Sequence, residues 1–187
     1  MKDSLIDSSR LDFASFFQRL MAGISDWLIL NLLSLLSLYF LASATSRTQL
    51  FTYLILLITL VIIPASVFNI FYYVWFISQQ GSTPGKSIWG VKIVADDSGE
   101  NLSFTAAFMR EAIMKRVSAF FFGLGFWWFW KSSDRQTWHD LLIGSYALNM
   151  RTPTITSWIL FTILVAINGI LVAMLLAKIP VLIGLFF

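Results

Sequence analysis

The sequence predicts an all-α integral membrane protein with three spanning helices, a re-entrant helical hairpin and a small cytoplasmic β element. The first observation is composition: 58% of the 187 residues are hydrophobic and only 12% are charged, about half the charged share of a soluble domain. The second is that residues 27–46 and 48–80 contain no charged side chain. Each run reaches the roughly 20 residues needed to cross a hydrocarbon core.

The first predicted helix covers about residues 20–44 and contains an acidic residue, Asp26. If Arg19 lies at headgroup level, Asp26 lies about 10 Å deeper on nearly the same helix face, because seven residues are close to two turns. Helical side chains lean toward the N-terminus, so Arg19 is not expected to bind Asp26 directly. Buried charges in membrane helices are costly, so Asp26 is a candidate functional residue; a purely structural hydrogen bond or ion pair is the alternative.

The second predicted helix, about residues 50–77, is longer than a perpendicular span needs and should tilt or bend. Pro64 lies near its middle and leaves a backbone carbonyl without its usual donor, which a membrane helix tolerates when a neighbour supplies a partner. Asn69 follows as a neutral polar group. Aromatic residues within 72–75 are typical of a membrane interface.

The chain is expected to leave the membrane over a cytoplasmic loop, residues 79–104. Turn residues occupy 81–85, and a short β-prone run, Ile88 to Val94, follows them. A polar turn around Gly99 could fold Leu102 to Phe104 back as a hairpin.

The same loop contains Gly85-Lys86-Ser87, which is similar to the end of a phosphate-binding loop. The spacing back to Gly81 is one residue short, and the glycines follow a membrane helix where that motif requires a strand. A nucleotide site is therefore not expected.

An amphipathic helix and a hairpin are expected over residues 105–130. The uncharged stretch 117–130 is short for a span, and Gly123 and Gly125 interrupt it near its middle. With a cytoplasmic N-terminus, a true crossing would place more basic residues outside than a hairpin would. The positive-inside rule therefore favours a hairpin that returns to the cytoplasmic side.

The segment 131–150 is expected at the cytoplasmic surface and contains the neighbours His139 and Asp140, which we interpret as orienting the start of a helix. A second β-prone run, Ser145 to Met150, could pair with Ile88 to Val94.

A last apolar run, Thr154 to Leu176, predicts an additional C-terminal transmembrane helix. Together these elements indicate a multi-pass membrane protein, with the lipid bilayer as its main partner and a cytoplasmic N-terminus. We expect it in the bacterial cytoplasmic (inner) membrane.

Several classes of function are not expected. The chain has no cysteine and one histidine, so neither thiolate catalysis nor a metal site with three or four ligands is predicted. Ser and Thr residues are not paired with a base in a recognisable spacing, so we expect neither an enzyme nor a bound cofactor. The net charge is +3 with scattered basic residues, which favours an anionic leaflet over nucleic acid.

Four short patterns occur in order along the chain: Arg19 with Asp26; Thr83-Pro84-Gly85-Lys86 with Gly90-Val91-Lys92-Ile93-Val94; Arg110; and His139-Asp140. Over about residues 16–150 these patterns resemble the RDD family of small multi-pass membrane proteins. The family is named for an arginine at the start of the first helix, an aspartate within it and a second aspartate, to which we assign Asp140. The resemblance implies an RDD-like membrane domain over residues 1–150, suspected of transport and without an agreed substrate.

Two hypotheses about function remain. In the first, the protein is a small transporter or exchanger of cations or protons. Asp26 would bind the ion, Asp140 and Arg19 would form an ionic latch, and Asn69 would offer neutral ligands. Because three spans and a hairpin enclose little, a homo-oligomer would then be needed.

In the second hypothesis, the protein is a non-catalytic membrane scaffold or accessory subunit with a membrane protein partner, and Arg19, Asp26 and Asp140 are structural. A hydrated cavity at Asp26 would favour transport. An Asp26 sealed against a basic side chain such as Arg110 would favour the scaffold.

Overall fold

The computed structural model describes residues 11–120 and 122–184. The chain divides into two compact units. Unit 1 contains the N-terminal segment through Asp26 together with Ile70–Ser157, and unit 2 contains Trp27–Asn69 together with the chain from Trp158 onward.

Within the described residues, two helices are long and apolar enough to cross a membrane. The first is α1 (Phe16–Leu41), and the second comprises α9 (Ile155–Leu176) and the short α10 (Ile179–Gly184), which together give the candidate span Ile155–Gly184. Most side chains of α9 are exposed, as expected of a helix surrounded by lipid.

The second predicted helix is present as three joined elements. They are α2 (Arg47–Leu56), the π-helical stretch η2 (Leu57–Ile62) and α3 (Ile63–Gln80). The wider π-helical turns come directly before Pro64, because a proline ring clashes with the carbonyl four residues earlier and removes a helical hydrogen bond. That this segment forms a third span remains a prediction.

Within unit 2, a polar side chain joins α9 to α1. The amide of Asn168 donates to the carbonyl of Leu28 at 3.3 Å and to that of Leu164 at 2.9 Å. Nearer the end of the same pair of helices, the ammonium of Lys178 lies 5.9 Å from the ring centroid of Tyr39. Hydrogen bonds such as those of Asn168 are the usual way in which a polar residue is accommodated between membrane helices.

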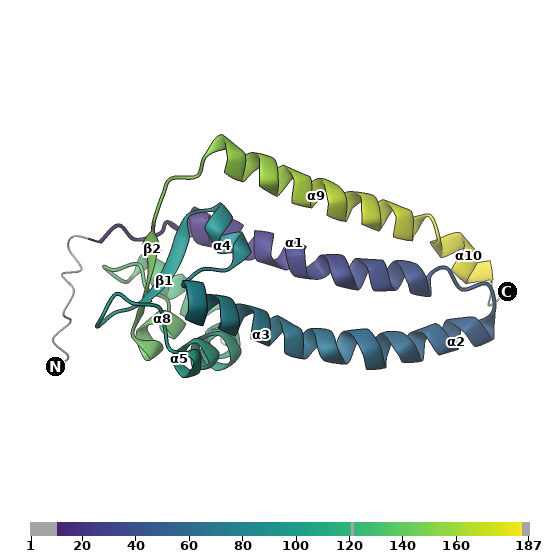
Figure 1. Ribbon diagram of the computed structural model, residues 1–187, viewed down its shortest axis with the longest axis horizontal. Coiled ribbons are helices and arrows are strands. Elements are labelled where there is room, and N and C mark those ends of the chain that lie inside the picture. Colours follow the sequence, from purple (N-terminus) through teal and green to yellow (C-terminus); the bar gives the residue numbers. More distant parts are fainter. Residues whose placement is uncertain (1–10, 121, 185–187) are drawn as a thin grey trace. The chain divides into compact units, whose positions relative to one another are not determined.

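The predicted β element is confirmed. Strands β1 (Val91–Ala95) and β2 (Ser145–Asn149) pair antiparallel, with Val91 opposite Asn149 and Ala95 opposite Ser145 (Figure 1). The short helices α4 (Pro84–Ile88) and α8 (Trp138–Ile143) lead directly into these strands. Unit 1 is therefore a small folded body around a two-stranded sheet.

One local prediction is wrong. The chain does reverse around Gly99, where the amide of Ala95 donates to the carbonyl of Glu100 at 2.9 Å, but Leu102 to Phe104 do not return as a strand. The hydroxyl of Ser103 accepts from the amide of Ala106 at 3.2 Å and begins a helix. N-capping by serine thus prevails over the β-prone residues beside it.

The helical run after Ser103 ends in a hairpin. It consists of α5 (Phe104–Phe108), the π-helical η3 (Met109–Met114) and α6 (Lys115–Phe120), and the chain returns as α7 (Leu124–Trp127) and the 3-10 turn η4 (Trp128–Trp130). The backbone takes a positive φ at the turn, 76° at Gly123. A Cβ on Gly125 would lie 2.6 Å from the Cα of Ser118, so only glycine permits this close return.

Candidate functional site

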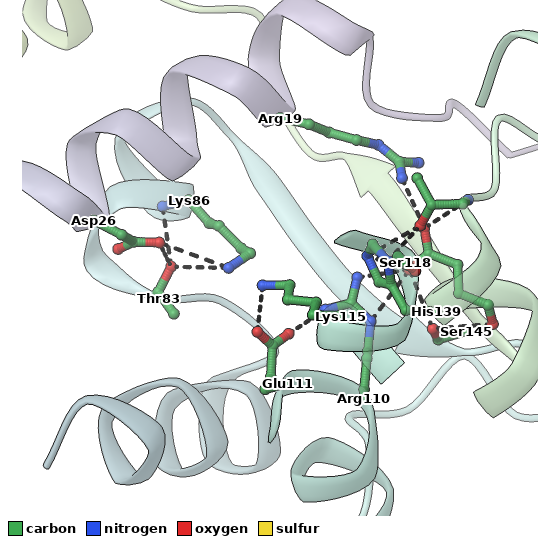
Figure 2. Close-up of polar contacts among 12 residues, drawn as sticks. Arg19, Asp26, Thr83, Lys86, Arg110, Glu111, Lys115, Ser118, His139 and Ser145 are labelled. Atoms are coloured by element: carbon green, nitrogen blue, oxygen red, sulfur yellow. Dashed lines mark hydrogen bonds and ion pairs between the residues drawn. The ribbon is translucent and has the colours of Figure 1, made fainter. Parts of the chain in front are cut away.

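Both acids predicted as site residues lie in unit 1, and both are fully buried, with Asp26 and Asp140 at 0% exposure. Figure 2 shows two clusters of polar side chains, one around Asp26 and one near Arg19 and Arg110. A buried carboxylate needs partners for each of its oxygens. The structure supplies them from different elements in the two cases.

The carboxylate of Asp26 accepts three hydrogen bonds and faces one cation. Oδ1 accepts from the hydroxyl of Tyr72 and from the amide of Gly85, both at 2.8 Å. Oδ2 accepts from the hydroxyl of Thr83 at 2.6 Å, and the ammonium of Lys86 lies 3.6 Å away. Both carboxylate oxygens of Asp26 are thus bound by groups of the protein.

The sequence Thr83-Pro84-Gly85-Lys86 is explained residue by residue at this contact. Thr83 is the N-cap of α4, and its hydroxyl accepts from the amide of Lys86 at 3.3 Å. Proline suits the first helical position because it has no amide to satisfy. A Cβ on Gly85 would lie 2.5 Å from Oδ1 of Asp26 and 2.7 Å from the carbonyl of Ala22. Glycine is therefore needed for α4 to approach α1.

A second contact fixes the same face of α1. The indole Nε1 of Trp89 donates to the hydroxyl of Ser25 at 2.9 Å, and Trp89 is 0% exposed. The side-chain amide of Gln18 donates to the carbonyl of Trp89 at 3.1 Å and to Oδ1 of Asn149 at 2.7 Å. Gln18, Ser25 and Asp26 lie on one face of the helix, so the base of α1 is packed against the loop and sheet of unit 1.

The carboxylate of Asp140 binds two arginines. Arg19 Nη1 lies 2.9 Å from Oδ2, which is the ionic contact that the sequence suggested. Arg110 approaches Oδ1 with Nη2 at 2.6 Å and Nε at 3.2 Å. Oδ2 also accepts from the amide and hydroxyl of Thr137, so Asp140 completes a capping box at the start of α8.

Three further charges lie between the two acids. Glu111 forms ion pairs with Arg110 and with Lys115. The ammonium groups of Lys115 and Lys86 lie 4.9 Å and 5.2 Å from the ring centroid of Tyr73. In Figure 2, Glu111 and Lys115 lie between the Asp26 cluster and the Arg110 cluster. The two predicted acids thus belong to one network of mostly buried charges, in which Lys86 and Lys115 share the ring of Tyr73.

The network sets the charges of its members outside the membrane-spanning segments. Burial raises the pKa of Glu111 and of Asp140, but the neighbouring cations outweigh it, and both pKa values lie below their ordinary range. Burial, with repulsion from Lys115, lowers the pKa of Lys86 to about 8. Glu111 and Asp140 are therefore ionised at neutral pH, while Lys86 titrates close to neutral pH.

His139 belongs to the packing around Asp140. Burial lowers its pKa to about 3, so its ring is neutral at pH 7. The hydroxyl of Ser118 lies 3.2 Å from His139 Nδ1, an arrangement that spacing along the chain could not reveal. However, Ser118 is 0% exposed, and Gly125 packs directly on it. The contact joins α6 to α8 and gives a substrate no access to the hydroxyl.

The structure separates the predicted site residues into groups. Arg19, Arg110 and Asp140 meet directly. Asp26 has Lys86 as its basic neighbour, not Arg110. Asn69 belongs to unit 2, and its side chain is exposed.

Sequence reasoning missed Lys86 and Glu111 as members of the site. A signal for Glu111 was available, because it is the only acid between residues 101 and 133 and it lies four residues before Lys115. The signal for Lys86 was its position in the Thr83-Pro84-Gly85-Lys86 pattern, which contributed to the family resemblance but did not indicate a contact with Asp26.

The fold and the site together define a class: a helical membrane protein in which buried charges fix the base of the first membrane helix within a small folded unit. Comparison with known proteins gives the same class. The model of the RDD family matches residues 13–144, and the chain belongs to the RDD family. No curated protein and no solved structure matches the chain. The match ends before α9, so this C-terminal helix lies outside the family unit.

Proposed function

We propose that this protein is a non-catalytic membrane scaffold or accessory subunit, in which Arg19, Asp26 and Asp140 hold the base of the first membrane helix within unit 1. The observation that supports this most directly is the enclosure of Asp26. Its carboxylate has 0% exposure and is occupied by three hydrogen bonds and the nearby Lys86. A carboxylate that exchanged ions would need a hydrated approach.

The proposal includes a topology. Unit 1 lies at the cytoplasmic face of a bacterial inner membrane, with the N-terminus on that side, and the joined helices α2 to α3 form a third span. Asp140, bound by two arginines and capping α8, then keeps the cytoplasmic unit folded. A stable surface of this kind is what a membrane protein partner would recognise.

The test compares Asp26→Asn with Asp97→Asn, which changes an exposed acid on the polar turn of the same unit. In the scaffold, Asp26→Asn leaves Lys86 buried without its charge partner, so the protein unfolds at lower temperature in detergent, whereas Asp97→Asn does not. Affinity purification from the native membrane should recover a constant partner with wild type and with Asp97→Asn. Unchanged stability of Asp26→Asn would contradict the proposal.

A second candidate function is exchange of cations or protons across the membrane. One observation favours it. Lys86 and Asp26 form an ion pair inside the protein, and the 3.6 Å between Nζ and Oδ2 is longer than a direct hydrogen bond. Such a pair can be opened by a competing cation more easily than the two-arginine site at Asp140.

Ion flux in proteoliposomes separates the two functions. An exchanger that uses this pair would carry cations against a pH gradient, and Asp26→Asn would abolish that flux in protein that remains folded. Asp97→Asn is again the matched control. A scaffold gives no flux above empty liposomes in any of the three proteins.

A further inference from the structure

The hairpin of residues 115–130 carries an exposed apolar surface that the charge network does not use. Phe122 at its tip is 100% exposed, and Trp127 on the returning arm is 65% exposed. We define the hairpin surface by the following exposed residues: Val117, Phe122, Leu124, Trp127 and Trp130. An apolar surface of this extent on a folded unit marks a site of interaction.

The opposite face of the same helical run is buried and polar. Arg110, Glu111 and Ser118 lie there, within the charge network. The run is therefore amphipathic in the reverse sense to a soluble helix of this unit, because its charges face inward and its large apolar groups face outward. An outward apolar face of this kind requires an apolar surrounding.

The backbone at the tip of the hairpin takes an unusual conformation. Phe122 has a φ of 50°, a conformation that bulky residues seldom adopt, and Gly123 follows with 76°. Gly125 packs against Ser118. A strained conformation persists where the surrounding structure fixes it, and it often marks a functional position. Here it points a phenylalanine away from the unit.

The charges beside the hairpin surface have one sign. Lys115, Arg116 and Lys131 are basic, and there is no acidic residue between Glu111 and Asp134. Arg116 and Lys131 are exposed, and the ammonium of Lys131 lies 4.9 Å from the ring centroid of Trp128. Lysine and arginine that rise from an apolar surface beside tryptophan are typical of the headgroup region of a bilayer.

We propose that the hairpin surface inserts into one leaflet of the membrane and that Arg116 and Lys131 bind the phosphates of anionic phospholipids there. The uncharged arm is too short to cross the bilayer, so insertion is shallow and the hairpin returns to its own side. Anionic lipid is the occupant that matches a positive rim without acids. The hairpin would bind lipid in the same way in a scaffold or in a transporter.

Depth is measured by fluorescence quenching. Because the chain has no cysteine, Phe122→Cys can be labelled at one site with an environment-sensitive fluorophore in proteoliposomes. Nitroxide lipids that carry the quencher just below the headgroup should quench the label several-fold more than aqueous iodide. Ser98→Cys, on the exposed polar turn, is the matched control and should show the opposite order.

Two results would overturn insertion. Quenching of the Phe122→Cys label mainly by iodide would place the tip in water. A label protected from both quenchers would place it against protein, either a second copy or another region of the chain.

Headgroup preference is measured with the same label. Quenching by a nitroxide-labelled anionic phospholipid should exceed quenching by its zwitterionic counterpart about twofold at equal content. Arg116→Gln and Lys131→Gln should each reduce this preference, Lys131→Arg should keep it, and Lys92→Gln, which removes a charge from β1, should leave it unchanged. Equal quenching by both lipids in Phe122→Cys without a further change, or a preference that survives both glutamine substitutions in that background, would overturn binding of anionic headgroups.

Discussion

Arg19 and Asp26 lie two turns apart on α1 and are held by different elements of unit 1. Arg19 binds Asp140 of α8 at 2.9 Å, whereas Asp26 accepts from Tyr72 of α3 and from Gly85 of α4, both at 2.8 Å. Because the helical backbone between them is stiff, the two contacts fix the same stretch of α1 at two points. Arg19, Asp26 and Asp140 thus act together to fix the base of α1 within unit 1.

The first prediction concerns the two arginines that share Asp140. The side chain of Arg110 is 3% exposed and that of Arg19 is 15% exposed. Arg110→Gln leaves a buried carboxylate with less compensation and should lower the free energy of unfolding by about 3–5 kcal/mol. Arg19→Gln should cost less, about 1–3 kcal/mol, because water reaches part of this pair.

A double-mutant cycle with Asp140→Asn in detergent measures both pairs. The coupling energy to Asp140 should be larger for Arg110 than for Arg19, within the range of about 0.5–3 kcal/mol found for residues in direct contact. Equal coupling energies, or a larger one for Arg19, would contradict this ranking.

The second prediction concerns the crossing of α4 over α1. In Gly85→Ala, the new Cβ would lie 2.5 Å from Oδ1 of Asp26 and 2.7 Å from the carbonyl of Ala22. Neither atom can move without shifting the α1 backbone or breaking the Asp26 contacts, so the variant should lose about 1–3 kcal/mol of stability. Thermal unfolding in detergent provides the measurement.

Gly23→Ala is the matched control, because Gly23 lies on α1 next to Ala22 and has nothing within 4 Å of its Cβ position. It should be neutral or stabilise α1 slightly, because alanine favours helix more than glycine does. If the two alanine variants change the stability equally, the close approach of α4 to α1 does not require glycine at position 85.

Much of the fold could be predicted because its signals are local. Long uncharged runs indicated the membrane helices, and two β-prone runs indicated strands that do pair, Val91–Ala95 with Ser145–Asn149. Arg19, Asp26 and Asp140 were singled out because charge is rare in this chain and therefore informative. Local propensity failed at Leu102 to Phe104, where one serine cap decides the conformation.

The partners of the two acids could not be predicted, because they come from elements far apart in the sequence. Asp26 meets Thr83 and Lys86 across more than fifty residues, and no periodicity encodes which cation reaches which carboxylate. Arg110 was considered as one basic side chain that could seal Asp26, and in the structure it binds Asp140. Packing of η3 against α8 determines that choice, and the sequence pattern of either element alone does not contain it.

The third prediction concerns the tyrosine bound to Asp26. Tyr72→Phe removes a hydroxyl that donates to the carboxylate at 2.8 Å, and the carboxylate stays buried with one partner fewer. The expected loss is about 1.5–3 kcal/mol, the usual range for a hydrogen bond to a charged group.

The neighbouring Tyr73→Phe serves as control in the same unfolding experiment. Its ring contacts with Lys86 and Lys115 depend on the aromatic face, which phenylalanine keeps. We expect a change below about 1 kcal/mol. A Tyr73→Phe variant less stable than Tyr72→Phe would show that the contact with Asp26 is not the main role of this pair of tyrosines.

The last prediction concerns pH. The pKa of His139 is lowered from 6.5 to about 3 by burial, so the unfolded chain binds a proton near pH 6.5 that the folded protein takes up only near pH 3. Stability that is fully present above pH 6.5 is therefore lost as the pH falls, at up to about 1.4 kcal/mol per pH unit. Asp140 and Glu111 act in the same direction, but only nearer their ordinary pKa values of 3.8 and 4.5.

Between pH 6.5 and about 5 the histidine should dominate the slope of stability against pH. The variant His139→Gln keeps a polar group near Ser118 without titrating and should flatten this slope. Unfolding in detergent across this window measures the difference. A wild-type slope that persists in His139→Gln would assign the acid sensitivity to another group. The absence of any slope in wild type would mean that His139 is protonated in the folded protein over this pH range. The histidine would then be a cation beside Arg110 and Lys115 in the network around Asp140.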